Sequence, residues 1–223
     1  MARGVRAAIT ASRGAQPQPG GAATSSRTPS NGPLKISSLR EQLRAYVPRP
    51  LEAPSRQRAA VLLPLLGRED DPQLLCFRRS WKVLEHRGEV CFPGGSAEPQ
   101  DAGPVQTALR ESFEELGLSG SAVEILGMLD DVETAVSNYV VTPVVGFVSG
   151  SPDLIADQLE VDTIIYVPIS RLREPGVFSS QWSVDGGAGN LRYAYEFDQQ
   201  RIWGATARML HGLLAVWQGR AAP

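Results

Sequence analysis

The stretch LRESFEELGL, residues 109–118, decides how this chain is interpreted. It contains one arginine, Arg110, and three glutamates, Glu111, Glu114 and Glu115. On a helix of about 3.6 residues per turn, Glu111 and Glu115 lie one turn apart and Glu114 flanks Glu111. Like charges at this spacing each cost an isolated helix about 0.2–0.5 kcal/mol, so the sequence predicts that something positive faces them.

The apolar residues of the same segment predict which side of the helix is buried. Four of them fall on one stripe: Val105, Leu109, Phe113 and Leu116. That stripe is expected to face the core, with the glutamates on roughly the opposite side. Two interpretations of the glutamates are open at this point. They form either a solvated face paired with the neighbouring arginine and water, or a site for a hard cation such as Mg²⁺ or Mn²⁺.

A glycine-rich loop precedes the helix. FPGGSAEPQD, residues 92–101, includes Gly94 and Gly95, which have no Cβ and let the main chain approach a ligand closely. Glu98 and Asp101 add two acids near the start of the helix. Asp101 is explained more simply by the preference for acidic residues at helix N-termini. The loop and the helix together favour the cation site over the solvated face.

Loop and helix together resemble the Nudix box, which is a glycine, five residues, an acid and then the pattern REUxEExGU, where U is aliphatic. Gly95 and Asp101 match the glycine and the acid, and RESFEELGL, residues 110–118, matches the pattern. Three features depart from the box. The acid is aspartate rather than glutamate, eight residues rather than seven separate it from Arg110, and Ser112 stands where an aliphatic residue is usual.

The loop is one residue longer than in the usual box, and in this it resembles the coenzyme A pyrophosphatase branch of that family. The branch has an upstream signature of arginine and serine, several residues, and then HxGxxxFPGG. The matching residues here are Arg79, Ser80, His86, Gly88 and FPGG at 92–95. Leu84 departs from the signature, since the branch usually has arginine there, and the change bears on substrate selectivity. The resemblance extends from about Ser37 to Trp217.

The resemblance implies roles for the site residues. Glu111 and Glu115 are the expected principal ligands of Mg²⁺ or Mn²⁺, with Glu114 as a third ligand directly or through water. Arg110 is expected to pair with these glutamates and hold their side-chain conformations. The base that deprotonates water varies within the family, and Glu114 and Glu98 are the candidates. The residues expected to contact substrate are Arg79, His86, Gly94, Gly95 and Glu98.

The implied reaction is hydrolysis of a small molecule, coenzyme A or an acyl-CoA, to a 4′-phosphopantetheine and adenosine 3′,5′-bisphosphate. Two other functions are open: hydrolysis of another nucleoside diphosphate derivative, such as ADP-ribose or a dinucleotide, and binding of a nucleotide without catalysis. The intact run RESFEE, residues 110–115, argues against a binder, because binding alone needs no full set of metal ligands. Monomer and homodimer are both open.

Composition divides the chain near residue 35. The first 36 residues contain five basic and no acidic residues, and the remaining 17 basic and 24 acidic residues leave that part at −7. Residues 1–35 are expected to be a disordered tail or a transit peptide. A transit peptide would place the protein in the mitochondrial or plastid matrix, and a plain tail would leave the cytoplasm as the expected location. An acidic domain does not resemble a nucleic-acid binder. No apolar run reaches the ~18 residues that span a membrane.

The resemblance implies that residues 36–220 form one Nudix domain of the α/β (α+β) class, an α/β/α sandwich around a mixed β-sheet. Patterning predicts helices at 37–47, 103–117 and 205–217, and strands at 59–66, 73–79, 89–92, 123–132, 139–148, 162–169 and 191–197. Trp203 is expected to anchor the core, and Cys76 and Cys91 to be small buried residues. Residues 174–190 are expected to form a loop or hairpin beside the site.

Overall fold

The helices and strands of the computed structural model follow the predicted order. It describes residues 34–83, 86–134, 137–185 and 188–222, so nearly all of the predicted tail, and Leu84, lie outside the described residues. The helices are α1 (Ile36–Ala45), α2 (Pro104–Leu116) and α3 (Gly204–Trp217), with short 3₁₀ turns at Gly120–Ala122 and Arg171–Arg173. The strands are β1 (Gln57–Arg68), β2 (Asp71–Arg79), β3 (Val90–Cys91), β4 (Gly94–Ser96), β5 (Glu124–Met128), β6 (Val132–Glu133), β7 (Tyr139–Ser149), β8 (Val161–Pro168), β9 (Phe178–Asp185), β10 (Ala188–Phe197) and β11 (Gln200–Trp203).

Strand β1 is the middle of an eight-stranded sheet, in which β3, β2, β1, β7 and β5 are neighbours in that order. β1 and β7 run parallel from the pair Gln57 and Tyr139 to the pair Gly67 and Ser149. β2 and β4 are antiparallel to β1, while β8 pairs with β2 and β6 pairs with β7. The sheet is therefore mixed, as predicted.

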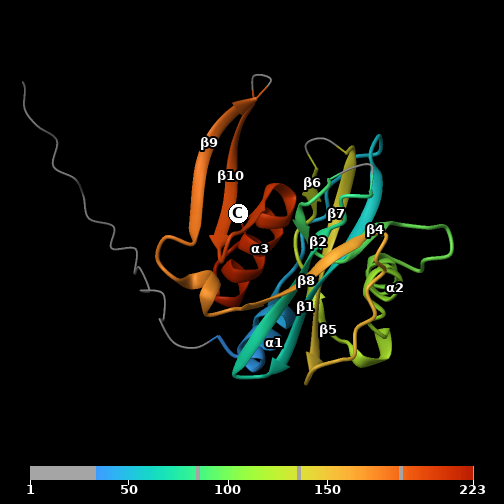
Figure 1. The fold of residues 1–223 in the computed structure, drawn as a ribbon. Helices are drawn as coiled ribbons and strands as arrows, with labels where there is room; N and C mark the ends of the chain where they lie inside the picture. Colours follow the sequence, from blue (N-terminus) through green and yellow to red (C-terminus); the bar gives the residue numbers. More distant parts are fainter. Residues whose placement is uncertain (1–33, 84–85, 135–136, 186–187, 223) are drawn as a thin grey trace, which may run out of the picture.

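Helices cover both faces of this sheet, which explains the unbroken apolar run in β1. Leu63 and Leu65 belong to the hydrophobic cluster that includes residues of α1 and α3. Leu62 and Leu66 point the other way, into the cluster that includes residues of α2. Figure 1 shows α1 and α3 on one side of the sheet and α2 on the other. The predicted α/β/α sandwich is confirmed.

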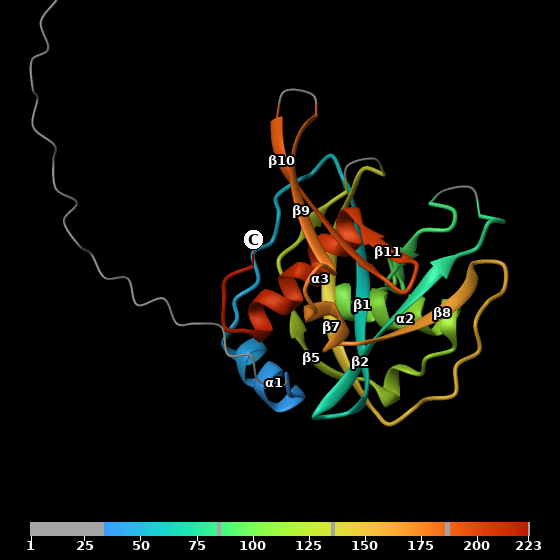
Figure 2. The ribbon, with the colours of Figure 1, turned by 60° about the vertical axis from the view of Figure 1, so that its left-hand side comes forward.

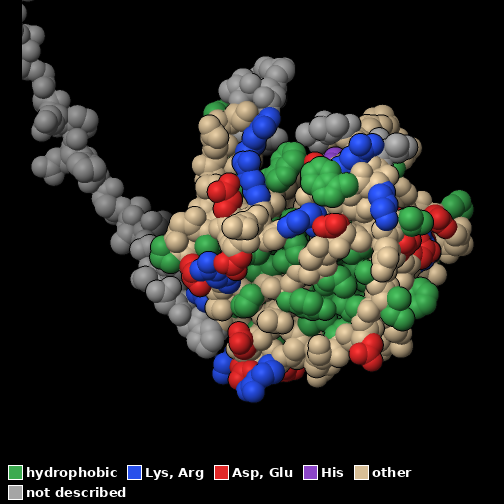
Figure 3. Space-filling view, in the orientation of Figure 1, with side chains coloured by type: hydrophobic (Ala, Val, Ile, Leu, Met, Phe, Trp, Pro, Cys, Tyr) green, Lys and Arg blue, Asp and Glu red, His purple; other side chains and the backbone are tan. Residues whose placement is uncertain are grey.

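A second sheet of three strands, in the order β11, β10, β9, packs on α3. The rings of Phe178 and Tyr193 stack on the imidazole of His211, with centroids 4.8 and 4.4 Å away. β9 and β10 pair as an antiparallel hairpin that projects beyond α3 (Figure 2), so of the two forms predicted for residues 174–190, a loop or a hairpin, the structure has the hairpin. Figure 3 shows basic and hydrophobic side chains meeting in the hollow between this hairpin and the main sheet.

The predicted buried stripe of α2 is wrong in one important respect. Phe113 is 60% exposed, whereas Leu116 is buried and Glu115, expected on the polar side, is only 3% exposed. The helix packs through small side chains, because Ala108 and Ser112 face the sheet and Ser112 Oγ donates to the Ala108 carbonyl at 2.6 Å. This rotation turns one glutamate into the protein and one phenylalanine out of it.

Two further expectations need correction. Trp203 does not anchor the core, because it is 48% exposed. Cys76 is buried as predicted, but Cys91 is only partly buried, and both are free thiols. Strand β4 is not predicted by the sequence patterns, which indicate only a turn at its glycines. In the described part of the chain, no helix is long and apolar enough to cross a membrane.

Candidate active site

The first two residues of strand β4 are glycines that lie very close to neighbouring atoms. Gly94 has φ +154°, and a Cβ there would lie 2.4 Å from the Ala60 carbonyl oxygen and 2.5 Å from Val61 Cα. A Cβ on Gly95 would lie 2.5 Å from the carboxylate of Glu111. The clash at Gly94 is with the fixed main chain of β1, so that position needs glycine. The clash at Gly95 is with the end of a side chain, so a Cβ there would displace the Glu111 carboxylate.

Glu115 is a buried carboxylate with few compensating partners. Its Oε2 accepts the Gly94 N–H at 2.9 Å, and Arg79 Nη1 lies 3.7 Å from its Oε1. Burial raises the pKa of Glu115 to about 8, against the opposing effects of that hydrogen bond and of Arg79. A carboxylate in this position is stabilised when it binds either a cation or a proton.

Glu111 lies one turn earlier on the same helix and is 18% exposed at its side chain. Burial also raises the pKa of Glu111, while the guanidinium of Arg110, 3.0 Å from its Oε1, opposes the rise. Glu114 is the third glutamate, and its side chain is 55% exposed. The three predicted metal ligands therefore differ in environment, and Glu111 and Glu115 are the two that the fold shields from water.

Arg110 holds the β4–α2 loop and the glutamates together. Its Nε and Nη2 donate to the two oxygens of Asp101 at 3.2 and 3.1 Å, and Nη2 also donates to the Ser96 carbonyl at 2.9 Å. Its Nη1 donates to Glu111 at 3.0 Å and to Glu114 at 3.2 Å. A planar guanidinium can bridge these acceptors at once, which fixes the side chain of Glu111 in front of β4.

Asp101 is a structural acid of the loop. Besides Arg110, its carboxylate accepts the Glu98 N–H at 3.0 Å and the Thr107 hydroxyl at 2.9 Å. The hydrogen bond from Arg110 is the main reason that the pKa of Asp101 falls to about 2. Glu98 itself lies at the surface of the loop, where it accepts a hydrogen bond from Gln100 and is 3.9 Å from Arg110.

Four of the residues predicted to contact substrate line one cavity of about 310 Å³: Arg79, His86, Gly94 and Gly95. The cavity lies on the α3 side of the sheet, since Ala205, Thr206 and Met209 also line it. His86 has φ +55° and its Nδ1 is 3.0 Å from Glu89 Oε2. Glu98 and the three glutamates of α2 are not among the lining residues, so β4 stands between the cavity and the carboxylates.

Glu160 is a neighbour of the site that the sequence patterns do not single out. It precedes β8, and its carboxylate lies 3.8 Å from Arg79 Nη2. Its carbonyl accepts the Ser80 N–H at 2.7 Å, which ties the start of β8 to the end of β2. Arg79 therefore lies between Glu115 and Glu160 and also reaches the cavity. Its Nε is buried and has no hydrogen-bond partner among the described residues.

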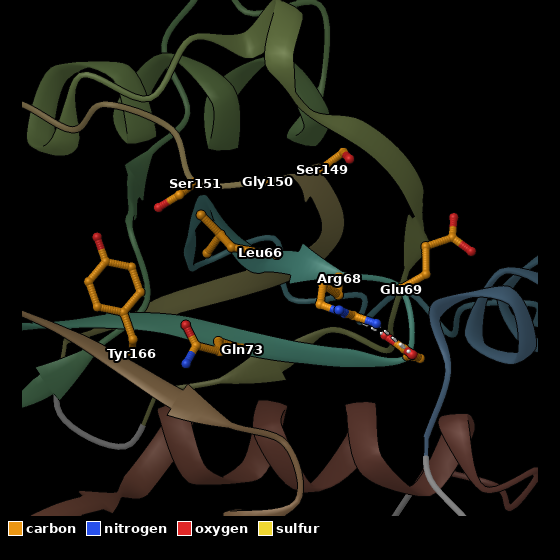
Figure 4. Close-up of a pocket in the computed structure, with 10 residues that line it drawn as sticks. Leu66, Arg68, Glu69, Gln73, Ser149, Gly150, Ser151 and Tyr166 are labelled. Carbon is orange, nitrogen blue, oxygen red and sulfur yellow. Dashed lines mark hydrogen bonds and ion pairs between the residues drawn. The ribbon is translucent and has the colours of Figure 1, made fainter.

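A larger cavity of about 590 Å³ lies at the far end of β1 (Figure 4). Leu66, Gln73 and Tyr166 border it, and Ser149, Gly150 and Ser151 close one side. None of the residues predicted for the active site lines it. The catalytic assignment therefore rests on the smaller cavity and not on the larger one.

The side chains of the site supply some, but not all, of the ligands that a divalent cation needs. In the described ranges, no three carboxylate, imidazole or thiol side chains are already placed to hold a metal ion. Glu111 and Glu115 nevertheless offer hard oxygen donors one turn apart, and the missing Cβ of Gly95 leaves main chain beside them. Mg²⁺ and Mn²⁺ commonly use one or two carboxylates together with water and substrate phosphates, and such a site fits these residues.

Comparisons with known proteins agree with this geometry. The NUDIX domain model matches residues 55–178. Proteins named "Uncharacterized Nudix hydrolase NudL" are similar: one from Yersinia enterocolitica is 38% identical over 158 residues, covering 70% of this chain and 78% of the relative. Another from Photorhabdus laumondii is 37% identical over 182 residues, covering 81% and 96%. "Nudix hydrolase 3" of Caenorhabditis elegans is 34% identical over 176 residues, covering 70% and 72%.

The matched range contains β4 and α2 together, so the glycines and the glutamates that they approach lie inside it. Nudix hydrolases generally use divalent metal ions, in keeping with the oxygen donors of Glu111 and Glu115. The chain belongs to the Nudix family and is a Nudix hydrolase acting on a nucleoside diphosphate derivative.

Proposed function

We propose that this hydrolase cleaves the diphosphate of coenzyme A, and of acyl-CoAs, to a 4′-phosphopantetheine and adenosine 3′,5′-bisphosphate. The observation that carries the proposal is the gathering of Arg79, His86, Gly94 and Gly95 around one cavity next to the glutamate helix. These residues belong to the upstream signature that resembles the coenzyme A branch. Their convergence supports a joint role in binding one substrate.

Glu111 and Glu115 would hold Mg²⁺ or Mn²⁺, with Glu114 as a further ligand directly or through water. The cation supplies neutralisation of the diphosphate oxygens, which otherwise repel an incoming nucleophile. Arg79 would add a second positive charge, since its unpartnered Nε and its neighbour Glu115 place it at the boundary of cavity and carboxylates. Arg110 keeps Glu111 in place through its bonds to the loop.

In the proposed reaction a water oxygen forms a bond to one phosphorus, and the bond from that phosphorus to the bridging oxygen breaks. One water proton goes to a carboxylate base, and the departing phosphate keeps the electron pair. Glu114 and Glu98 are the bases proposed from the sequence. Glu160 is added by the structure, because its carboxylate lies across Arg79 from Glu115.

The test is a product analysis with coenzyme A, ADP-ribose and NADH in the presence of Mg²⁺ or Mn²⁺. The proposal expects the highest kcat/KM for coenzyme A and the appearance of adenosine 3′,5′-bisphosphate. Faster cleavage of ADP-ribose would instead favour a hydrolase of another nucleoside diphosphate derivative. The departure from the branch signature at Leu84 is what keeps that alternative open. The location is tested separately, by following a fluorescent protein fused behind residues 1–35, which we propose to be a transit peptide.

A further inference from the structure

A second cavity, of about 510 Å³, adjoins the one that holds the predicted substrate contacts. It is lined by three arginines and two tryptophans, namely Arg78, Arg87, Arg201, Trp81 and Trp203. Glu89 and Trp203 line both cavities, so the two are neighbours that share these side chains as a common border. A substrate whose diphosphate lies at β4 can therefore extend into this second cavity, which we call the arginine–tryptophan cavity.

The arginine–tryptophan cavity carries an excess of positive charge. Arg78 donates to the neutral side chain of Gln200 at 2.8 Å and also pairs at 3.8 Å with Asp162, which does not line the cavity. Arg87 Nε donates to the neutral Val83 carbonyl. The only acid that lines the cavity among the described residues, Glu89, already faces His86. Arg201 is paired with Glu196 outside the cavity, but both side chains are more than 60% exposed, so water screens that pair.

The two tryptophans present aromatic surface to the same space. Trp81 is 67% exposed and Trp203 is 48% exposed. The ring of Trp81 lies against Gly88, where a Cβ would come within 2.6 Å of it, so the absence of a side chain at Gly88 leaves room for the ring. Exposed indole rings beside arginines are suited to stacking against a nucleobase whose phosphate the arginines bind.

We propose that the arginine–tryptophan cavity binds an adenine nucleotide through a phosphate monoester, which in coenzyme A is the 3′-phosphate. The inference rests on the proposed function and makes it more specific. ADP-ribose, NADH and 3′-dephospho-coenzyme A all lack this monoester. The cavity thus selects among adenosine diphosphate derivatives by charge, while the glutamate helix cleaves the diphosphate that they share.

The experiment uses the full chain and two kinds of measurement. Binding of adenosine 3′,5′-bisphosphate and of adenosine 5′-monophosphate is measured by calorimetry, and kcat/KM is measured for coenzyme A and 3′-dephospho-coenzyme A. The variants are the double substitution Arg87→Gln/Arg201→Gln and the single substitution Trp81→Leu. The matched control is Arg68→Gln, an 81% exposed arginine at the β1–β2 turn.

The wild type should bind the bisphosphate at least about tenfold more tightly than the monophosphate, because charge-assisted hydrogen bonds to the extra phosphate are strong. The double variant should lose most of that preference, and its ratio of kcat/KM for the two coenzymes should fall by about the same factor. Trp81→Leu should weaken both nucleotides alike, and Arg68→Gln should change nothing.

A preference for the bisphosphate that survives in the double variant overturns the proposal, even if coenzyme A is the best substrate. The proposed function fails separately, if coenzyme A is not cleaved while ADP-ribose is. In that event the binding comparison still decides the role of the cavity, because a preference that the double variant loses supports a phosphate-binding site.

Discussion

Replacing Glu115 by glutamine should change how the stability of the metal-free protein depends on pH. The carboxyl group is 3% exposed and has a pKa of about 8, compared with 4.5 for an ordinary glutamate. Below pH 4.5 the group is protonated in both the folded and the unfolded chain. Between pH 4.5 and 8 the unfolded chain releases the proton while the folded chain keeps it, so the free energy of unfolding falls as pH rises.

The size of the effect follows from the two pKa values. At about 1.4 kcal/mol per pH unit, the difference between them corresponds to at most about 5 kcal/mol of lost stability at pH 8 and above. Glutamine cannot ionise, and its carbonyl oxygen can still accept the Gly94 N–H. The glutamine variant should therefore lack this pH dependence and be more stable than the wild type above pH 8 by a few kcal/mol.

The assay is urea unfolding in EDTA, followed by tryptophan fluorescence, at intervals between pH 5 and 9. Other titrating groups are common to both proteins, so the difference between the two curves isolates Glu115. Glu114→Gln is the matched control, because its side chain is 55% exposed and its exposed ion pair with Arg110 is worth less than about 1 kcal/mol. If the free energy of unfolding depends on pH in the same way for the wild type and for Glu115→Gln, then the pKa of the Glu115 carboxyl group is not raised by burial and the reasoning is refuted.

Mg²⁺ extends the same experiment. A ligand that binds only the folded chain stabilises it in proportion to the logarithm of its concentration above the dissociation constant. Added Mg²⁺ should therefore raise the free energy of unfolding of the wild type at pH 8, and should raise that of the glutamine variant much less. Equal stabilisation of the two proteins would mean that the cation binds somewhere other than Glu115.

Four further substitutions test other parts of the site and the packing of α2. Gly95→Ala should lower kcat about a hundredfold with the fold retained, because its Cβ displaces the Glu111 carboxylate; unchanged turnover would contradict the close approach. Arg110→Lys should lower kcat about tenfold, since an ammonium cannot bridge the same acceptors, and wild-type turnover would show that bridging is unimportant. Phe113→Ser should cost less than about 1 kcal/mol in urea unfolding, whereas Leu116→Ala should cost about 2–5 kcal/mol; the reverse order would restore the stripe predicted from the sequence.

Most elements of the fold could be predicted because their signals are local. α2 begins at Pro104, whose missing N–H costs nothing at a helix start, and ends at Gly117, which adopts φ +67°. In α1, in α3 and in the long strands of the main sheet, the spacing of apolar residues along the sequence is the one expected for the faces that are buried. β4 has only three residues and no apolar pattern, because its glycines are there to let other atoms come close.

The sequence pattern could not predict which side of α2 is buried, because the residues that contact its buried glutamate are distant in the sequence. Periodicity assigns Phe113 to the core and Glu115 to water. Glu115 is buried because the N–H of Gly94, 21 residues earlier, donates to it and Arg79 lies nearby. Glu160 was missed for the same reason, since only the pairing of β2 with β8 brings it to Arg79.

The position of β4 separates two tasks of the proposed reaction. The carboxylates of Glu111 and Glu115 lie with α2, while the cavity lies with α3, and the glycine main chain is the boundary. Arg79 is the side chain that contacts both sides, through Glu115 and through the cavity lining. Substitutions on α2 should therefore act mainly on kcat, and substitutions among the tryptophans and arginines of the second cavity mainly on KM. Arg79→Ala should affect both, because removing it leaves Glu115 without its nearest cation and the substrate without a phosphate contact.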